Sequence, residues 1–346
     1  VMYIFAIYAT PSPLSQDIFR RRRKKTRAGT MKPRLYRDDL LMERYRTTGA
    51  GMPGALFVLI CLTAGLYCRK SYRSIPVKKR LFVIDGHALC YRAYFAFIKN
   101  PLTNSKGQNT SAIFGFARML FRLLADQKPD YLVVAFDPPR KSFRFALYPE
   151  YKANREKMPE DLRSQIEEIK LMVETLGIRR IEEADYEADD VLGSIARSHA
   201  SKDLEVVLVT GDKDAYQLVD DNTSIYANRK GITEFETYDA AAVREKLGIG
   251  PAQVIDYMAL VGDASDNIPG VRGVGEKTAL KLIQEHGSLD GVYSNLDRIK
   301  GKLRETLESN RDMAYLSRDL VTIRTDLPVA LNIDETRTPD VHSEAA

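Results

Sequence analysis

Four short apolar runs separated by longer amphipathic stretches constrain the fold of this chain more than any other feature. The runs are residues 80–84, 131–136, 178–181 and 205–209. Runs of this length and composition are typical of strands that are buried on both faces of a parallel sheet. Helical periodicity covers residues 110–125, 159–176 and 188–199. This βαβ succession predicts an α/β fold with a mostly parallel central sheet flanked by helices.

The pattern divides the chain into parts. Residues 78–238 hold the predicted α/β domain. After about residue 239 the strand patterns stop, and short helical stretches separated by Gly and Pro predict a helical subdomain over residues 239–334. Residues 335–346 are expected to form a polar tail. A chain of 346 residues that is 44% hydrophobic can bury a core in each of two such domains.

Residues 1–77 do not follow this pattern. They carry 15 Lys and Arg against 4 Asp and Glu, which leaves 37 against 43 for the acidic remainder. Their apolar run at 55–68 is shorter than the roughly 20 residues of a membrane-spanning helix. We interpret the region as a disordered extension or as sequence upstream of the true start. A targeting segment or membrane anchor is the alternative. The expected location is the bacterial cytoplasm, at the nucleoid, or an organelle if the extension is a genuine targeting segment.

Carboxylates recur at the carboxyl ends of the predicted strands, where open α/β sheets place their sites. The candidate metal ligands are Asp85, Asp137, Glu187, Asp189, Asp190, Asp212, Asp214, Asp263 and Asp266. Gathered without counter-charge they would repel strongly, by about 4 kcal/mol for one pair about 4 Å apart at an effective dielectric of about 20. Hard divalent cations remove this conflict, and a set without histidine favours Mg²⁺ or Mn²⁺.

A single Asp at a strand end more often caps a helix or stabilises a turn. Four clusters at successive strand ends favour a shared site instead. Two cations that bridge a phosphate can activate water and stabilise the leaving oxygen. The sequence therefore predicts two-metal hydrolysis of phosphodiesters.

Five motifs resemble the 5′ nuclease domain of bacterial DNA polymerase I and its free-standing flap endonuclease relatives. They are FVIDGHALCYR (82–92), SFRFALYPEYKANR (142–155), EADD (187–190), TGDKD (210–214) and GDASDNIPGVRGVGEKTA (262–279). They occur in the family's order and at compatible spacing. The resemblance implies a PIN-like 5′ nuclease fold and a 5′-3′ exonuclease or structure-specific flap endonuclease, acting on DNA in replication (primer removal) and repair.

The resemblance also assigns metal ligands. Asp85, Asp137, Glu187 and Asp189 would hold the first Mg²⁺ or Mn²⁺. Asp212, Asp214 and Asp266 would hold the second, with Asp190 and Asp263 in support. A K⁺ ion is implied at a helix-hairpin-helix, and no small-molecule cofactor is expected.

Family members pass the 5′ single strand beneath a helical arch, which here would span about residues 138–160. Cations interleaved with aromatic side chains suit the phosphates and bases of a single strand. Lys152 and Arg155 match cations that contact the scissile phosphate, and Tyr151 matches a stacking aromatic. The set expected to contact DNA is Arg92, Lys141, Arg144, Gly270, Gly273, Gly275, Lys277 and Thr278. Taken alone, the segment could equally be an ordinary amphipathic helix with solvated charges.

The helix-hairpin-helix is expected over residues 265–286, with its Gly-rich turn presenting N–H groups to duplex phosphates. Close packing of helices is the plain alternative for such glycines. The expected partners are DNA with 5′ flaps, nicks, branches or 5′-ended duplexes, and a DNA polymerase. A PIN-like ribonuclease and a non-catalytic DNA-junction binder stay open as alternatives, as does the choice between a stand-alone nuclease and a fragment of a polymerase I.

Overall fold

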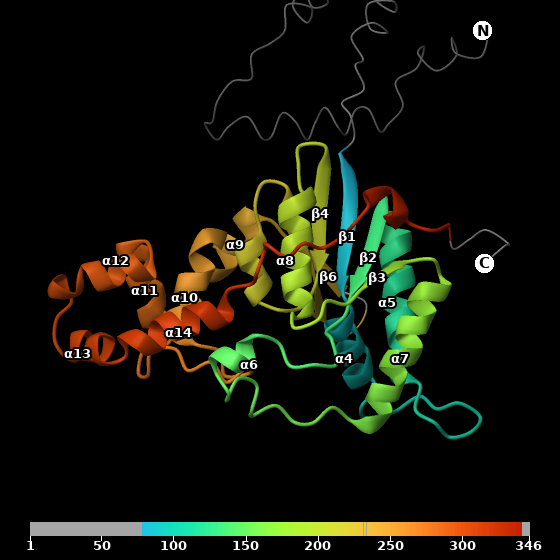
Figure 1. Ribbon diagram of the computed structural model, residues 1–346, viewed down its shortest axis with the longest axis horizontal. Helices are drawn as coiled ribbons and strands as arrows, with labels where there is room; N and C mark the ends of the chain where they lie inside the picture. Colours follow the sequence, from blue (N-terminus) through green and yellow to red (C-terminus); the bar gives the residue numbers. More distant parts are fainter. Residues whose placement is uncertain (1–77, 231, 233, 341–346) are drawn as a thin grey trace, which may run out of the picture. The chain divides into compact units, whose positions relative to one another are not determined.

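A six-stranded sheet forms the centre of the computed structural model, which describes residues 78–230, 232 and 234–340 (Figure 1). The predictions for residues 1–77 lie outside the described residues. The strands are β1 (Lys79–Asp85), β2 (Tyr131–Ala135), β3 (Arg179–Ile181), β4 (Leu204–Val209), β5 (Thr223–Lys230) and β6 (Glu234–Tyr238), in the order β3-β2-β1-β4-β5-β6. All neighbours pair in parallel except β5 and β6. The mostly parallel α/β sheet predicted from the sequence is confirmed.

Helices follow most strands. They are α4 (Gly86–Ala96), α5 (Ser111–Gln127), α6 (Arg144–Leu147), α7 (Glu160–Thr175), α8 (Ala188–His199), α9 (Ala240–Leu247), α10 (Val254–Val261), α11 (Glu276–His286), α12 (Leu289–Ser294), α13 (Lys302–Ser309) and α14 (Arg311–Val321). Short 3-10 turns lie at Asp214–Leu218, Pro251–Gln253, Leu296–Arg298 and Ile333–Thr336. The predicted strands and helices of the α/β part are present, with ends shifted by no more than two residues. Helix α4 and the β5–β6 hairpin were not predicted.

Alternate side chains of β1 supply the cores on the two faces of the sheet. Leu81 and Val83 pack with Val191 of α8 on one face. Phe82 and Ile84 pack with residues of α4, α5 and α7 on the other. Because side chains alternate between faces along a strand, a strand covered on both sides is apolar throughout. This explains the continuous apolar runs of the sequence.

The chain order of the strands fixes where a site can form. From β1 the chain moves to β2 and β3 on one side, and it then returns to β4 on the other side of β1. Open α/β sheets bind ligands at such a switch point, beyond the carboxyl ends of the strands. Asp85 is the last residue of β1. It therefore stands at the switch point.

The helices after β6 form a core of their own, which includes Leu260, Ile283, Val292 and Leu307. β6 ends at Tyr238, where the strand patterns were expected to stop. Of the predicted range 265–286, only the second part is helical, as α11. The preceding helix, α10, ends at Val261. The next residue, Gly262, takes a left-handed φ of 77°, and a Cβ there would lie 2.3 Å from the Ile268 carbonyl oxygen, which leaves no room for a side chain.

Two segments differ from the prediction. Among the described residues, α6 is the only helix within the expected arch at 138–160. Prolines at 138, 139, 149 and 159 disfavour a continuous helix there. The polar tail was predicted to begin at residue 335, but the chain is still packed against the domain there. Thr336 is buried, and the Thr338 N–H donates to the Asp130 carbonyl beside β2.

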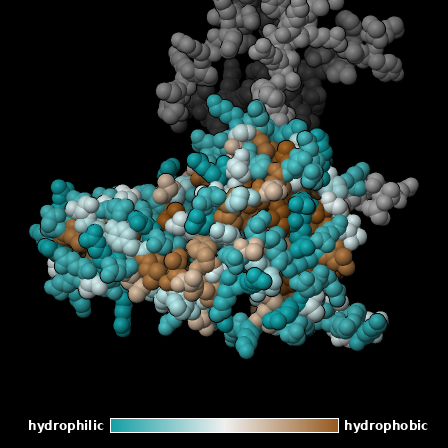
Figure 2. Space-filling view, in the orientation of Figure 1, coloured by the Kyte–Doolittle hydropathy of each residue, from teal (hydrophilic) through white to brown (hydrophobic). Residues whose placement is uncertain are grey.

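The surface seen in Figure 2 is mostly hydrophilic, with hydrophobic side chains in separate patches. Among the residues described, no helix combines the length and the apolar character that a membrane span requires.

Candidate active site

Seven of the nine predicted carboxylates line one cavity of about 220 Å³ at the carboxyl edge of the sheet. They are Asp85, Asp137, Glu187, Asp189, Asp212, Asp214 and Asp266. Lys152 and Arg155 line the same cavity. The structure thus brings together side chains that lie up to 181 positions apart in the sequence, from Asp85 to Asp266.

The ends of the strands orient the first of these carboxylates. Asp85 caps α4 by accepting the Ala88 N–H at 2.9 Å, and the Thr210 hydroxyl donates to its other oxygen at 3.1 Å. Asp137 accepts the Ala188 N–H at the start of α8 at 2.7 Å. Each carboxylate is therefore held by a backbone N–H at the start of a helix, and both residues line the cavity.

Burial and mutual repulsion make the acidic cavity costly to charge. Burial raises the pKa of Asp85 to about 7, and the neighbouring Asp137 and Asp212 add to this shift. Burial likewise raises the pKa of Asp189 and of Asp214, with Asp212 as the next contribution in both cases. Carboxylates with pKa values raised in this way become fully ionised near neutral pH only when a positive charge lies beside them.

The chemistry of the donors fits divalent cations. The Oδ1 atom of Asp189 is buried and has no hydrogen-bond partner among the described residues. A buried carboxylate oxygen without a donor is a costly group that a cation would satisfy. No three Asp, Glu, His or Cys side chains of the described chain are arranged to hold an ion as they stand. The ligand types therefore fit the ions, while their final positions would require side-chain movement.

Two cations neutralise part of the cavity. The Lys152 Nζ lies 2.9 Å from Glu187 Oε1 and 3.6 Å from Asp266 Oδ2, and Arg155 also pairs with Asp266. Burial alone would raise the pKa of Glu187, but Lys152 and Arg144 outweigh it and lower that pKa. Lys152 itself takes a left-handed φ of 56°, held by its N–H bond to the Asp266 carbonyl.

Arg144 and Asp190 form a buried ion pair, and of the two only Arg144 lines the acidic cavity. Arg144 donates to both oxygens of Asp190, at 2.7 and 2.8 Å, and to the carbonyls of Leu320 and Thr322. Its exposed fraction is 3%, and that of Asp190 is 0%. Asp190 does not line the acidic cavity, so its prediction as a metal ligand is wrong. The guanidinium of Arg144 is held by bonds within the protein, which disfavours its predicted contact with DNA. The sequence shows the charges but not their burial.

Tyr151 does not offer its ring to a base. The ring is 3% exposed and lies edge-on to Phe145, with centroids 5.3 Å apart. Its hydroxyl donates to Glu187 at 3.0 Å and to Asp266 at 3.1 Å. Burial and these carboxylates raise the pKa of Tyr151, so the hydroxyl keeps its proton. The stacking role predicted from the sequence is wrong for this arrangement.

The glycines before α11 divide into two kinds. Gly270 is buried, its N–H donates to the Ser317 hydroxyl, and a Cβ there would lie 2.5 Å from backbone atoms, so its predicted DNA contact is wrong. Gly273 and Gly275 are exposed, as is Lys277, and Thr278 is half-buried. The N–H groups of Gly273, Gly275 and Lys277 make no hydrogen bond within the described part of the chain.

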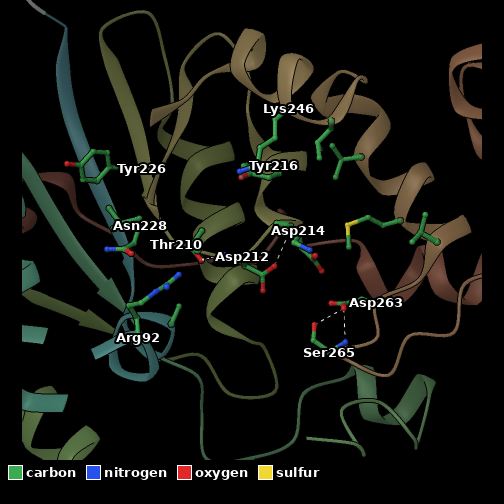
Figure 3. Close-up of a pocket in the computed structure, with 18 of the residues that line it drawn as sticks. Arg92, Thr210, Asp212, Asp214, Tyr216, Tyr226, Asn228, Lys246, Asp263 and Ser265 are labelled. Carbon is green, nitrogen blue, oxygen red and sulfur yellow. Dashed lines mark hydrogen bonds between the residues drawn. The ribbon is translucent and has the colours of Figure 1, made fainter. Parts of the chain in front are cut away.

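A larger cleft of about 970 Å³ adjoins the acidic cavity, and both are lined by Asp212 and Asp214 (Figure 3). Arg92 lines the cleft from α4, and Lys277 lines it from the start of α11. Asp263 lines this cleft and not the acidic cavity. Its carboxylate accepts hydrogen bonds from the N–H and the hydroxyl of Ser265. The cleft thus joins the carboxylates to the first turn of α11.

Three polar residues at or beside the site were not among the predicted site residues. Thr210 orients Asp85, and the His87 Nδ1 accepts the N–H of Asp137 at 2.9 Å. Both belong to motifs that the sequence displays. Asn228 lines the large cleft, and both polar atoms of its side chain are buried without a partner among the described residues. No sequence signal could have found Asn228, because its strand was not predicted.

A parallel sheet that gathers carboxylates at its carboxyl edge, with Lys and Arg side chains facing them, defines an α/β domain of the class of nucleases whose active sites are built from Asp and Glu. Residues 80–248 match the family described as "5'-3' exonuclease, N-terminal resolvase-like domain". Residues 249–344 match "5'-3' exonuclease, C-terminal SAM fold". The chain belongs to the 5′-3′ exonuclease family, which confirms both the predicted family and the predicted enzyme class, a nuclease.

Curated relatives support this membership. The chain is 43% identical over 257 residues to DNA polymerase I of Bacillus subtilis, which covers 74% of this chain and 29% of that protein. It is 46% identical over 264 residues to DNA polymerase I of Deinococcus radiodurans, covering 75% and 27% respectively. The chain therefore spans less than a third of the length of the curated relatives it matches.

Solved structures share the fold. "Crystal Structure of T5 D15 Protein Co-crystallized with Metal Ions" aligns with a TM-score of 0.56 at 21% identity, covering 71% of this chain and 90% of that one. "Divalent metal ions (zinc) bound to T5 5'-exonuclease" aligns with a TM-score of 0.57 at 23% identity and the same coverage.

Proposed function

We propose that this chain hydrolyses DNA phosphodiesters by a two-metal mechanism, as a 5′-3′ exonuclease and structure-specific 5′ flap endonuclease. The observation that carries the proposal is the single cavity lined by seven carboxylates, one of which has a buried oxygen without a partner. Asp85, Asp137, Glu187 and Asp189 would hold one Mg²⁺ or Mn²⁺, and Asp212, Asp214 and Asp266 the other. When bound, such ions lower the pKa of water and stabilise charge on the phosphate.

Lys152 and Arg155 would bind the scissile phosphate. Both line the acidic cavity, and both are paired with its carboxylates. Once the carboxylates are neutralised by other cations, these pairs weaken and the two side chains become available to the phosphate oxygens. Cations placed where charge develops in the transition state speed the reaction. Arg92 and the exposed Lys141 would contact neighbouring phosphates.

The turn before α11 would bind the duplex. Unbonded N–H groups at the start of a helix attract phosphate, and Lys277 adds a positive charge. The large cleft is lined by Lys277 at the start of α11 and by Asp212 and Asp214, so a strand held at this helix start would reach the carboxylates. Gly273, Gly275 and Thr278 belong to this proposed contact. A K⁺ ion at the turn stays a prediction.

The physiological substrates would be 5′ flaps, nicks and branched or 5′-ended duplexes, processed during primer removal and repair. The curated relatives are DNA polymerases, which supports a polymerase as a working partner. We retain the nucleoid as the proposed location, with an organelle as the alternative.

The direct test is Mg²⁺-dependent cleavage of a 5′-labelled DNA flap, with product length read at nucleotide resolution. We expect cleavage at the junction, and we expect Asp85→Ala and Asp212→Ala to abolish turnover while junction binding stays largely intact. Wild-type rates in either variant would contradict the metal assignment. Faster cleavage of a matched RNA flap would favour the ribonuclease, and junction binding without any product would favour the non-catalytic binder.

A further inference from the structure

Arg144 lines the acidic cavity and forms a buried ion pair with Asp190, which does not line it. Arg144 is in α6, within the segment that separates β2 from α7, and Asp190 is in the first turn of α8. The Arg144 guanidinium makes four hydrogen bonds, two to Asp190 and two to the carbonyls of Leu320 and Thr322. It therefore joins three segments that are distant in the sequence.

Asp190 connects the buried ion pair to Glu187 through hydrogen bonds. One oxygen of Asp190 accepts the Glu187 N–H at 3.1 Å, and the other accepts the Arg324 N–H at 2.9 Å. The Nη1 atom of Arg144 also lies 3.5 Å from Glu187 Oε2. The backbone and the carboxylate of Glu187 are thus both held by the same pair of buried charges.

The direction of the carboxylates depends on this start of α8. Glu187 precedes the helix, Asp189 lies in its first turn, and Ala188 gives its N–H to Asp137. Three of the four carboxylates assigned to the first ion are therefore positioned by this one helix start. If the helix start shifted, all three would move together.

We infer that Arg144 and Asp190 are positioning residues for the first metal site, neither of which touches DNA or the ion. This inference rests on the proposed function. Groups that hold metal ligands in place typically change metal affinity by about 10- to 100-fold when removed. The pair is buried, so loss of one partner alone would leave an unpaired charge and destabilise the fold. Replacing both charges by apolar side chains removes the positioning bonds without that penalty.

The test compares three variants of the full chain by Mn²⁺ titration without DNA, thermal unfolding and flap affinity in Ca²⁺. The first is the double replacement Arg144→Met with Asp190→Leu. The second is Arg144→Lys, which keeps the charge but not the paired bonds. The control is Arg324→Met, because the side chain of Arg324 pairs with Asp326 and its hydrogen bond to Asp190 comes from the backbone N–H.

We expect the double variant to stay folded, to bind Mn²⁺ about 10- to 100-fold more weakly, and to bind the flap as the wild type does. Arg144→Lys should lose less Mn²⁺ affinity, and Arg324→Met none. A folded double variant with wild-type Mn²⁺ affinity would overturn the inference, as would weakened flap binding with Mn²⁺ affinity intact. If the double variant does not fold, wild-type Mn²⁺ affinity in Arg144→Lys would overturn it. A wild-type protein that binds no Mn²⁺ would contradict the proposed function and this inference with it.

Discussion

The Nζ atom of Lys152 lies 2.9 Å from Glu187 Oε1 and 3.6 Å from Asp266 Oδ2, which bridges two carboxylates assigned to different metal ions. The Lys152 ammonium therefore occupies part of the space that the divalent ions would fill. The same segment is bonded to the loop before α11, since the Lys152 N–H donates to the Asp266 carbonyl and the Asn154 amide to that of Ala264. Metal binding and release of Lys152 are expected to be linked.

Removing this cation should strengthen metal binding. In Lys152→Ala the carboxylates of Glu187 and Asp266 lose a competing positive charge, so we expect Mn²⁺ affinity without DNA to rise roughly tenfold, or about 1.4 kcal/mol. Isothermal titration of the metal measures this. Lys141→Ala is the matched control, because the Lys141 Nζ lies over the Phe145 ring rather than on a carboxylate. An unchanged affinity in Lys152→Ala would argue against the competition.

The same variant should react slowly once substrate is bound. If Lys152 stabilises charge that develops on the phosphate, Lys152→Ala lowers kcat by roughly 100-fold or more and changes DNA affinity only slightly. Single-turnover kinetics at saturating metal separate the two effects. A raised KM with an unchanged kcat would remove the proposed role at the transition state.

The stability of the metal-free protein should fall as pH rises through the range in which Asp85 ionises. Folded Asp85 keeps its proton up to about pH 7, whereas in the unfolded chain it ionises near its ordinary pKa of 3.8. Stability from this group is therefore complete below about pH 4 and is lost as pH rises towards and through 7. Its size is at most about 4 kcal/mol. In EDTA, Asp85→Asn should gain Tm relative to the wild type between pH 4 and 8, and parallel Tm curves would contradict this.

Two glycines near α11 should respond differently to alanine. Gly275 has open space around a Cβ and an ordinary φ of −88°, so Gly275→Ala should fold normally but bind a DNA duplex several-fold more weakly. Gly270 has a φ of 60° and backbone atoms at 2.5 Å, so Gly270→Ala should lose about 3 kcal/mol of stability. Thermal unfolding and duplex titration together check the pair. Equal unfolding temperatures for both variants would refute the distinction.

Sequence periodicity predicted strands β1 to β4 because each of them is a short, continuous apolar run. It missed β5, which runs parallel to β4 but mixes polar residues into its sequence, TSIYANRK. It also missed the edge strand β6, Glu234–Tyr238, which has no continuous apolar run. It placed the arch as a helix, although prolines and bonds from Asn154 and Lys152 hold that segment in turns. Such tertiary bonds leave no trace in a local pattern.

The carboxylates of the site were predictable because they follow strands in the sequence. The parallel topology brings the ends of these strands together, so that the carboxylates line one cavity. The roles of Arg144 and Asp190 were not, because sequence motifs show charge but do not distinguish a buried ion pair from a contact with substrate. Tyr151 was misplaced for the same reason, since its hydroxyl bonds to Glu187 and Asp266 inside the protein.

The number of divalent ions bound at the acidic cavity tests the central claim most directly. Titration of the metal-free wild-type protein with Mn²⁺, followed by electron paramagnetic resonance, should show two ions per chain at neutral pH. Asp212→Asn should retain only the ion assigned to Asp85, Asp137, Glu187 and Asp189. A wild-type chain that binds no ion, or an Asp212→Asn chain that binds two as tightly as the wild type, would contradict the account.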